Sequence, residues 1–381
     1  VYLIHAYAGS RSGVNSILVI CELNAEGTEV ISDPVMVFDG NDGKNHTVEG
    51  PKLYKRNGYY YIFAPAGGVA TGWQLVLRSK NIYGPYESKI VMAQGKTTIN
   101  GPHQGGWVDT NTGESWFVHF QDQGAYGRVI HLNPMKWVNE WPVIGVDKDK
   151  DGCGEPVTTY KKPNVGKMYP VTTPPESDEF DTRHLGLQWQ WHANKQDTYG
   201  FTTDLGYIRL YAGSLSKEFV NFWEVPNLLL QKFPAEEFTA TTKLTFTAKQ
   251  DGEQAGMIVM GWDYSVRKAG DKFILQQVVC KDAEQQHPEQ VKELASFPVE
   301  YLKMPGVADN EWKTVYLRVK VAKGAVCTFA YSLDGKKYTA AGEPFTARQG
   351  KWIGAKVGLF CVTPNDGNRG WADVDWFRVT K

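Results

Sequence analysis

Short runs of alternating apolar and polar residues follow one another along the whole chain. They are rich in Val, Ile, Tyr, Phe and Trp, and turns such as Asn57-Gly58 and Thr112-Gly113 separate them. Such runs are typical of β-strands joined by tight turns, and hardly any stretch has the period of an amphipathic helix. The pattern predicts an all-β protein.

The first part of the chain repeats itself. Similar apolar segments begin at Tyr2, Tyr60 and Trp116, and each is followed by a second strand. The repeat, about 55 residues long and built only from strands, indicates propeller blades, because one four-stranded blade cannot bury both faces without neighbours. Three repeats are too few to close a ring, so further blades are expected ahead of residue 1.

A proline-rich stretch at 160–177 separates this part from a different pattern. Longer alternating strands follow, for example at 237–247, 314–321 and 371–379, without the earlier period. Two facing antiparallel sheets accommodate such strands. The sequence therefore predicts a partial β-propeller over 1–172 and a β-sandwich of the jelly-roll type over 173–381.

Charge and composition exclude several classes of partner. Lysine and arginine number 41 against 42 acidic residues, so no net field favours nucleic acid or an anionic membrane. Five cysteines without a CxxC pair argue against a disulfide framework and a zinc site. No apolar run is long enough to span a membrane. The start, Val1-Tyr2-Leu3-Ile4, reads as the middle of a strand and predicts that the chain is part of a longer protein.

The motifs of serine nucleophiles, zinc proteases and nucleotide-binding loops are absent, which leaves paired carboxylates as the common enzymatic option. Glu49 stands just ahead of a blade's aromatic strands, and His103 occupies the matching place one repeat later. Equivalent positions in neighbouring blades lie at the same end of a propeller channel, where a ligand would bind. The alternatives are an exposed strand-edge carboxylate and a structural histidine.

Three motifs in this order resemble glycoside hydrolase family 43, five-bladed propeller enzymes that include β-xylosidases and α-L-arabinofuranosidases. The motifs are Glu49-Gly50-Pro51-Lys52-Leu53-Tyr54, Pro102-His103-Gln104-Gly105 and Gly127-Arg128, the last followed by Trp137 and Trp141-Pro142. The resemblance covers 1–172. Beyond it, Ser177-Asp178-Glu179-Phe180 and Asp373-Val374-Asp375-Trp376 resemble the concanavalin-like β-sandwich of one branch of the family.

This resemblance implies an inverting exo-glycosidase that removes arabinofuranosyl or xylosyl units from plant cell-wall hemicellulose. Glu49 is similar to the family's general acid, and Arg128 to the arginine that holds hydroxyls of the terminal sugar. His103 is similar to the channel histidine near the sugar and a central calcium ion or its waters. A general acid must keep its proton near neutral pH, so we expect the pKa of Glu49 to be raised. The polymeric substrate predicts a secreted or periplasmic protein.

Inversion also requires a second carboxylate that acts as base. The resemblance places this base, and a third carboxylate that tunes the acid, in the first blades of the family, ahead of Val1. The chain is therefore expected to lack the catalytic base. A non-catalytic carbohydrate-binding protein is the alternative, and the sequence that precedes Val1 would separate the two.

Two groups of carboxylates are candidates for a structural calcium ion, and no organic cofactor is expected. Asp178 and Glu179 begin the sandwich and Asp375 lies near its end, so they can meet where the first and last strands pair. Charged strand-edge residues are the alternative. The loop at 147–155 alternates aspartates as calcium loops do, but Thr158 stands where an EF-hand needs glutamate. A solvated turn is the alternative there.

Overall fold

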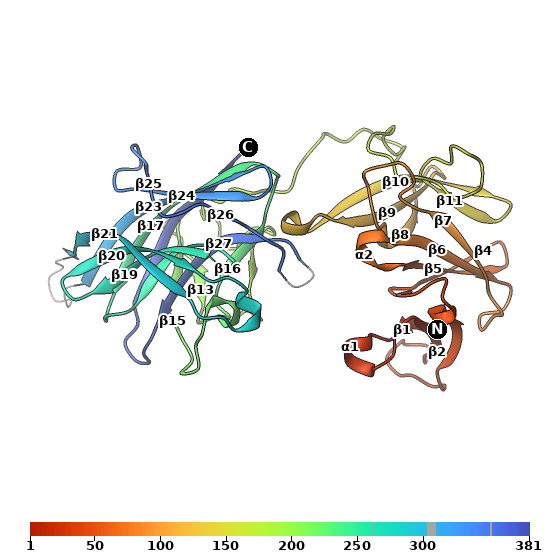
Figure 1. Ribbon diagram of the computed structural model, residues 1–381, viewed down its shortest axis with the longest axis horizontal. Coiled ribbons are helices and arrows are strands. Elements are labelled where there is room, and N and C mark those ends of the chain that lie inside the picture. Colours follow the sequence, from red (N-terminus) through yellow and green to blue (C-terminus); the bar gives the residue numbers. More distant parts are fainter. Residues whose placement is uncertain (261, 303–309, 351–352) are drawn as a thin grey trace. The chain divides into compact units, whose positions relative to one another are not determined.

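Antiparallel strands make up nearly all the regular structure, as the alternating pattern predicts. A computed structural model describes residues 1–260, 262–302, 310–350 and 353–381. By their contacts these residues divide into two compact units (Figure 1). The first comprises Val1–Gln123 and Arg128–Val171, and the second comprises Gly124–Gly127 and Thr172–Lys381.

Three separate antiparallel sheets form the first unit (Figure 1). The first contains β1 (Tyr2–Ala6), β2 (Ile17–Glu22) and β3 (Val35–Asp39). The second contains β4 (Lys52–Arg56), β5 (Tyr59–Ala66), β6 (Trp73–Ser79) and β7 (Glu87–Met92). The third contains β8 (His103–Asp109), β9 (Ser115–Asp122), β10 (Arg128–Val138) and β11 (Trp141–Ile144). The short helices α1 (Gly9–Ser12) and α2 (Gly68–Thr71) and the 3-10 turn η1 (Gly40–Asp42) lie in the connections.

These sheets are propeller blades that stack face to face, and β5 shows why. Because successive side chains of a strand point to opposite faces, Ile62 and Ala64 join one cluster while Tyr61 and Phe63 join another. The Ile62 cluster contains residues of the first sheet, including Leu18 and Ile20, whereas the Tyr61 cluster contains residues of the third, including Phe117 and Met135. The middle blade therefore buries one face against the first blade and the other face against the third.

Two sheets form the second unit. One has the strand order β12-β16-β27-β18-β19-β20-β21, with β15 on β27, and the other has the order β13-β14-β28-β17-β23-β24-β25, with β22 on β23 and β26 on β24. The first sheet consists of β12 (Gln190–Trp191), β15 (Gly213–Ser214), β16 (Leu229–Lys232), β18 (Gln254–Val259), β19 (Trp262–Ala269), β20 (Lys272–Val279), β21 (Gln290–Pro298) and β27 (Lys356–Thr363). The second consists of β13 (Gly200–Thr202), β14 (Ile208–Tyr211), β17 (Phe238–Ala248), β22 (Glu300–Leu302), β23 (Asn310–Ala322), β24 (Val326–Ser332), β25 (Thr339–Ala340), β26 (Phe345–Thr346) and β28 (Trp371–Thr380). The 3-10 turns η3 (Phe222–Glu224) and η4 (Ala283–Gln285) also belong to this unit.

The core of the second unit lies between these sheets, as in a sandwich. Val357 and Leu359 of β27 join this main cluster together with Leu244 and Phe246 of β17. The intervening Phe360 faces the opposite way and joins a smaller cluster around η3. The first sheet is therefore buried on one face by its partner sheet and partly covered on the other.

The tetrapeptide Gly124–Gly127 connects β9 to β10 but belongs by its contacts to the second unit. It contains the 3-10 turn η2 (Gly124–Tyr126). The Tyr126 hydroxyl donates to the carbonyl of Glu236 at 3.2 Å and accepts from the amide of Ala325 at 2.8 Å. The sequence pattern predicted one boundary near residue 172 and did not indicate that this tetrapeptide contacts the second unit. In the described part of the chain, no helix is long and apolar enough to cross a membrane.

Candidate active site

The segment before β4 fixes the backbone of Glu49. The amide of Glu49 donates to the carbonyl of Pro65 at the end of β5, and the amide of Gly67 donates to the carbonyl of His46. Val48 is fully buried in the cluster between the first two blades. The neighbouring Glu49 side chain does not belong to that cluster and is 42% exposed.

His103 lies directly beside Glu49, with its Nε2 atom 3.1 Å from Glu49 Oε1. His103 is the first residue of β8 and is completely buried, and the register of β8 against β9 shifts between His103 and Gly106. A carboxylate can only accept, so the Nε2 atom donates in this contact, and the other ring nitrogen is Nδ1. That Nδ1 atom is buried without a hydrogen-bond partner among the described residues.

Gln104 is a third member of the site. Its Nε2 atom donates to Glu49 Oε1 at 3.2 Å, and its backbone is left-handed with φ of 52°. Gly50 makes this approach possible: its φ is also 52°, and a Cβ atom there would lie 1.9 Å from Gln104 Oε1. Gln104 belongs to a predicted motif but was not a predicted site residue. Its position next to His103 in the sequence could have indicated that it lies in the site.

Arg128 completes the group from the start of β10. Its side chain is exposed, its guanidinium carbon lies 4.5 Å from the centre of the Phe120 ring, and that ring lies 6.0 Å from the His103 ring. Its charge is near enough to lower the pKa of Glu49. The structure thus brings Glu49, His103 and Arg128 to one place, while their catalytic roles stay predictions.

The pKa of Glu49 is lowered from its ordinary value, so the expectation of a raised pKa is wrong for this structure. The hydrogen bond from His103 is the largest cause, and the bond from Gln104 and the charge of Arg128 act in the same direction. Burial raises the pKa but is outweighed because the side chain is only half-buried. The expectation relied on burial and on a neighbouring carboxylate, and no carboxylate of the described residues contributes to this shift.

The strands β9 and β10 also carry a group of mostly buried polar side chains. His119 stacks on His131 with ring centres 5.4 Å apart, and its Nε2 atom lies 2.7 Å from the side-chain nitrogen of Asn133. Burial lowers the pKa of His119 to about 4. The Nε2 atom of His131 lies 3.1 Å from the side-chain oxygen of Gln121. His119 is therefore neutral at ordinary pH.

The carboxylates proposed for calcium in the sandwich have protein partners of their own. Glu179 is held by the Arg378 guanidinium through two bonds of 2.7 and 2.8 Å, and Asp375 is paired with Lys243. Asp178 accepts from the amide of Phe180 and the indole of Trp189. Two of the three carboxylates are thus already neutralised by cations, and calcium binding at this place stays a prediction.

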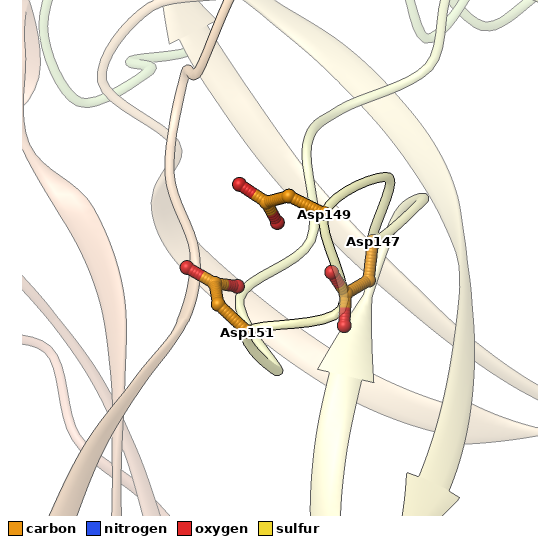
Figure 2. A group of neighbouring side chains, drawn as sticks. All are labelled: Asp147, Asp149 and Asp151. Carbon is orange, nitrogen blue, oxygen red and sulfur yellow. The ribbon is translucent and has the colours of Figure 1, made fainter.

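Asp147, Asp149 and Asp151 are the one described group whose ligand atoms converge, within 4.8 Å of one another. Figure 2 shows their side chains on the single loop that follows β11. Asp147 accepts from the amides of Lys150 and Gly152, and Asp151 accepts from that of Cys153. These bonds shape the loop as a turn, and calcium binding there stays a prediction.

Comparisons with known proteins agree with both units. Residues 1–142 match glycosyl hydrolases family 43, and residues 177–380 match the β-xylosidase C-terminal concanavalin A-like domain. A putative β-xylosidase of Xylanibacter ruminicola is 36% identical over 364 residues, which cover 94% of this chain and 62% of that protein. A non-reducing end α-L-arabinofuranosidase of Bacteroides ovatus is 30% identical over 234 residues, 56% of this chain and 42% of that protein.

Solved structures show the same fold. The family 43 protein BlXynB of Bacillus licheniformis superimposes with a TM-score of 0.75 at 25% identity, over 95% of this chain and 71% of that one. The chain spans about three fifths of the length of the Xylanibacter relative. The family 43 match precedes the match to the C-terminal domain in this chain, and the C-terminal match alone covers more than half of the chain. The chain belongs to glycoside hydrolase family 43, with a partial five-bladed propeller followed by the concanavalin A-like sandwich.

Proposed function

We propose that the protein is an inverting exo-glycosidase that cleaves arabinofuranosyl or xylosyl linkages of hemicellulose, with Glu49 as general acid. The observation that carries this proposal is the meeting of Glu49, His103 and Arg128 at the ends of neighbouring blades. The names of the relatives, β-xylosidase and α-L-arabinofuranosidase, support the choice of pentose linkages.

Each residue has a definite task in this reaction. An alkoxide leaves poorly, so Glu49 delivers a proton to the glycosidic oxygen as the bond breaks. His103 and Gln104 both bond the same oxygen, Oε1, and so orient the carboxyl group and leave Oε2 for the substrate. The exposed guanidinium of Arg128 supplies hydrogen-bond donors for sugar hydroxyls.

The lowered pKa of Glu49 sets a requirement for the complete site. The acid must be protonated when the sugar is bound, and a negatively charged base nearby raises the pKa of a carboxyl group. In inverting glycosidases the two carboxyl groups lie roughly 6.5–9.5 Å apart. We propose that this base comes from outside the 381 residues and that it also raises the pKa of Glu49.

Activity on a panel of aryl pentosides, measured on the full-length protein, tests the proposal. Glu49→Gln should lose about 10²–10⁴-fold activity on natural glycosides, because the general acid is gone. The loss should be much smaller on a dinitrophenyl glycoside, whose leaving group departs without a proton. Glu26→Gln, at an exposed position, is the control and should keep wild-type activity. Equal loss on both substrates would show that Glu49 is not the acid, and a full-length protein without pentosidase activity would refute the proposed function.

Two further points are proposals of the same kind. We propose a secreted or periplasmic location, since polymeric hemicellulose does not enter cells. We also propose a calcium ion near His103 that is held through water, because calcium takes oxygen ligands and the buried atom of His103 without a partner is a nitrogen. No step of the reaction above depends on it.

A further inference from the structure

The second unit contains a cavity of about 480 Å³ that the proposed reaction does not use. Its described lining belongs entirely to the second unit and combines apolar side chains, among them Trp223 and Met260, with the charged side chains Lys281, Asp282, Glu284, Arg348 and Lys356. A cavity of this size, with an apolar wall and a few convergent polar groups, is typical of a small-molecule site.

Lys356 reaches the cavity because of its position on β27. Val357 and Leu359 face the core of the sandwich, whereas Phe360 faces the opposite side. Residues two apart on a strand share a face, so Lys356 lies on the side of Phe360. Its side chain therefore stands on the face of the sheet that the second sheet does not cover.

This lysine is buried without an anion. Lys356 is 7% exposed, and its Nζ atom donates to the side-chain oxygen of Gln190 at 3.2 Å. Within the described ranges it forms no ion pair. Lys268, which is 5% exposed, lies 2.6 Å from Glu311 and 3.4 Å from Asp251. A buried ammonium group is costly unless it is paired. Burial accordingly lowers the pKa of Lys356, and the charge of Lys232 adds to this.

The remaining charges of the cavity largely cancel. Arg348 lies 3.0 Å from Asp282 and 2.7 Å from Glu284, so these carboxylates are already neutralised. Among the described lining residues, three carry a positive charge and two carry a negative charge, which leaves one positive charge in excess in this part of the wall. An anionic group of a ligand would balance it.

Hydrogen bonds fix the wall that carries Trp223. The side-chain nitrogen of Asn221 donates to the carbonyls of Ala283 and His287, and its oxygen accepts from the amide of Trp223. The carbonyl of Trp223 lies 2.8 Å from His192 Nε2. These bonds fix the backbone of Trp223, a partly exposed residue of the lining, and its indole offers a flat apolar surface of the kind on which a sugar ring stacks.

We propose that this cavity binds a sugar that carries a carboxylate, a hexuronic acid, with its carboxylate on the Lys356 ammonium group and its ring on Trp223. The ammonium group supplies the charge-assisted hydrogen bonds that a carboxylate accepts. The choice of a sugar rather than another carboxylate rests on the proposed function, whereas the need for an anion rests on Lys356 alone. The site shares no residue with the group around Glu49.

Calorimetric titration of the intact protein with D-glucuronate and with D-glucose tests the proposal. The two sugars differ only in the carboxylate, so glucuronate should bind at least about tenfold more tightly, and added salt should weaken its binding. Lys356→Met should reduce glucuronate affinity at least about tenfold and remove the preference over glucose. Lys217→Met is the control, because Lys217 is an exposed lysine of the second unit that lies outside the cavity and does not contribute to the pKa shift of Lys356.

Two further variants distinguish loss of binding from misfolding. Lys356→Arg keeps the positive charge and should keep the preference for glucuronate, while Trp223→Leu should weaken the binding of both sugars. Equal binding of the two sugars, undiminished binding by Lys356→Met, or no glucuronate binding by the folded wild-type protein would each overturn the proposal. Preference for inorganic phosphate or acetate over glucuronate would also overturn it. Aryl-pentosidase activity, measured on the same preparation, separates a failure of this site from a failure of the proposed function.

Discussion

Gly50→Ala should disturb the candidate active site through a single methyl group. Gly50 has a left-handed backbone, and the new Cβ atom would lie 1.9 Å from Oε1 and 2.5 Å from Cδ of Gln104. The Gln104 side chain must therefore move away and give up its hydrogen bond to Glu49. Gly58→Ala is the matched control, because Gly58 has φ of 78° but nothing within 4 Å of the added atom.

Both variants incur the free-energy cost of a left-handed backbone, and only Gly50→Ala also loses a hydrogen bond. A left-handed backbone costs a residue other than glycine about 1–2 kcal/mol, which both variants incur. A hydrogen bond to a charged group contributes about 1.5–3 kcal/mol, which we reduce to about 1 kcal/mol because the Glu49 side chain is 42% exposed. At about 2–4 °C per kcal/mol for a unit of this size, Gly50→Ala should lower the melting temperature about 2–4 °C more than Gly58→Ala.

The same variant should change the pH dependence of activity in the full-length protein. Loss of the Gln104 bond removes one cause that lowers the pKa of Glu49, so that pKa rises. A general acid works while protonated, and its activity is lost as pH rises through its pKa. The alkaline limb of the kcat/KM profile should therefore move to higher pH in Gly50→Ala and stay in place in Gly58→Ala.

Scanning calorimetry and the pH dependence of kcat/KM, measured for both variants, test these two predictions. If Gly50→Ala melts at the same temperature as Gly58→Ala and keeps the wild-type profile, then Gln104 does not hold Glu49 as described.

Other predictions concern the sandwich. Burial raises the pKa of Glu289 to about 7, so the folded protein binds a proton there that the unfolded chain releases at its ordinary, lower pKa. The free energy of unfolding should fall by roughly 2 kcal/mol as pH rises from about 5 to 8, and urea titrations of Glu289→Gln should show a flatter dependence. Tyr126→Phe loses the bonds to Glu236 and Ala325 and should destabilise the second unit by about 1–2 kcal/mol, whereas Tyr169→Phe, at an exposed position, should not. A Tyr126→Phe protein as stable as wild type would show that these bonds do not hold the tetrapeptide.

Local pattern was enough to predict the all-β fold and the blades. Alternation and turn residues act over a few positions, and the repeat reports the blades because each buries its faces against the next. The repeat also predicted that Glu49 and His103 would approach each other, since equivalent positions of neighbouring blades lie at the same end. Their 3.1 Å contact agrees with that reasoning.

Contacts between residues far apart in the sequence determine the features that the sequence pattern did not predict. The direction of the Glu49 pKa shift depends on which donors surround the carboxylate, and Gln104 reaches it only because Gly50 leaves room. The pairing of Glu179 with Arg378, 199 positions away, depends on how the first and last segments of the sandwich meet. Burial of Lys356 without an anion likewise follows from its neighbours across the sheet. Sequence specifies each residue's charge and preferred backbone, but burial and partners, which set the energy of that charge, exist only in the folded chain.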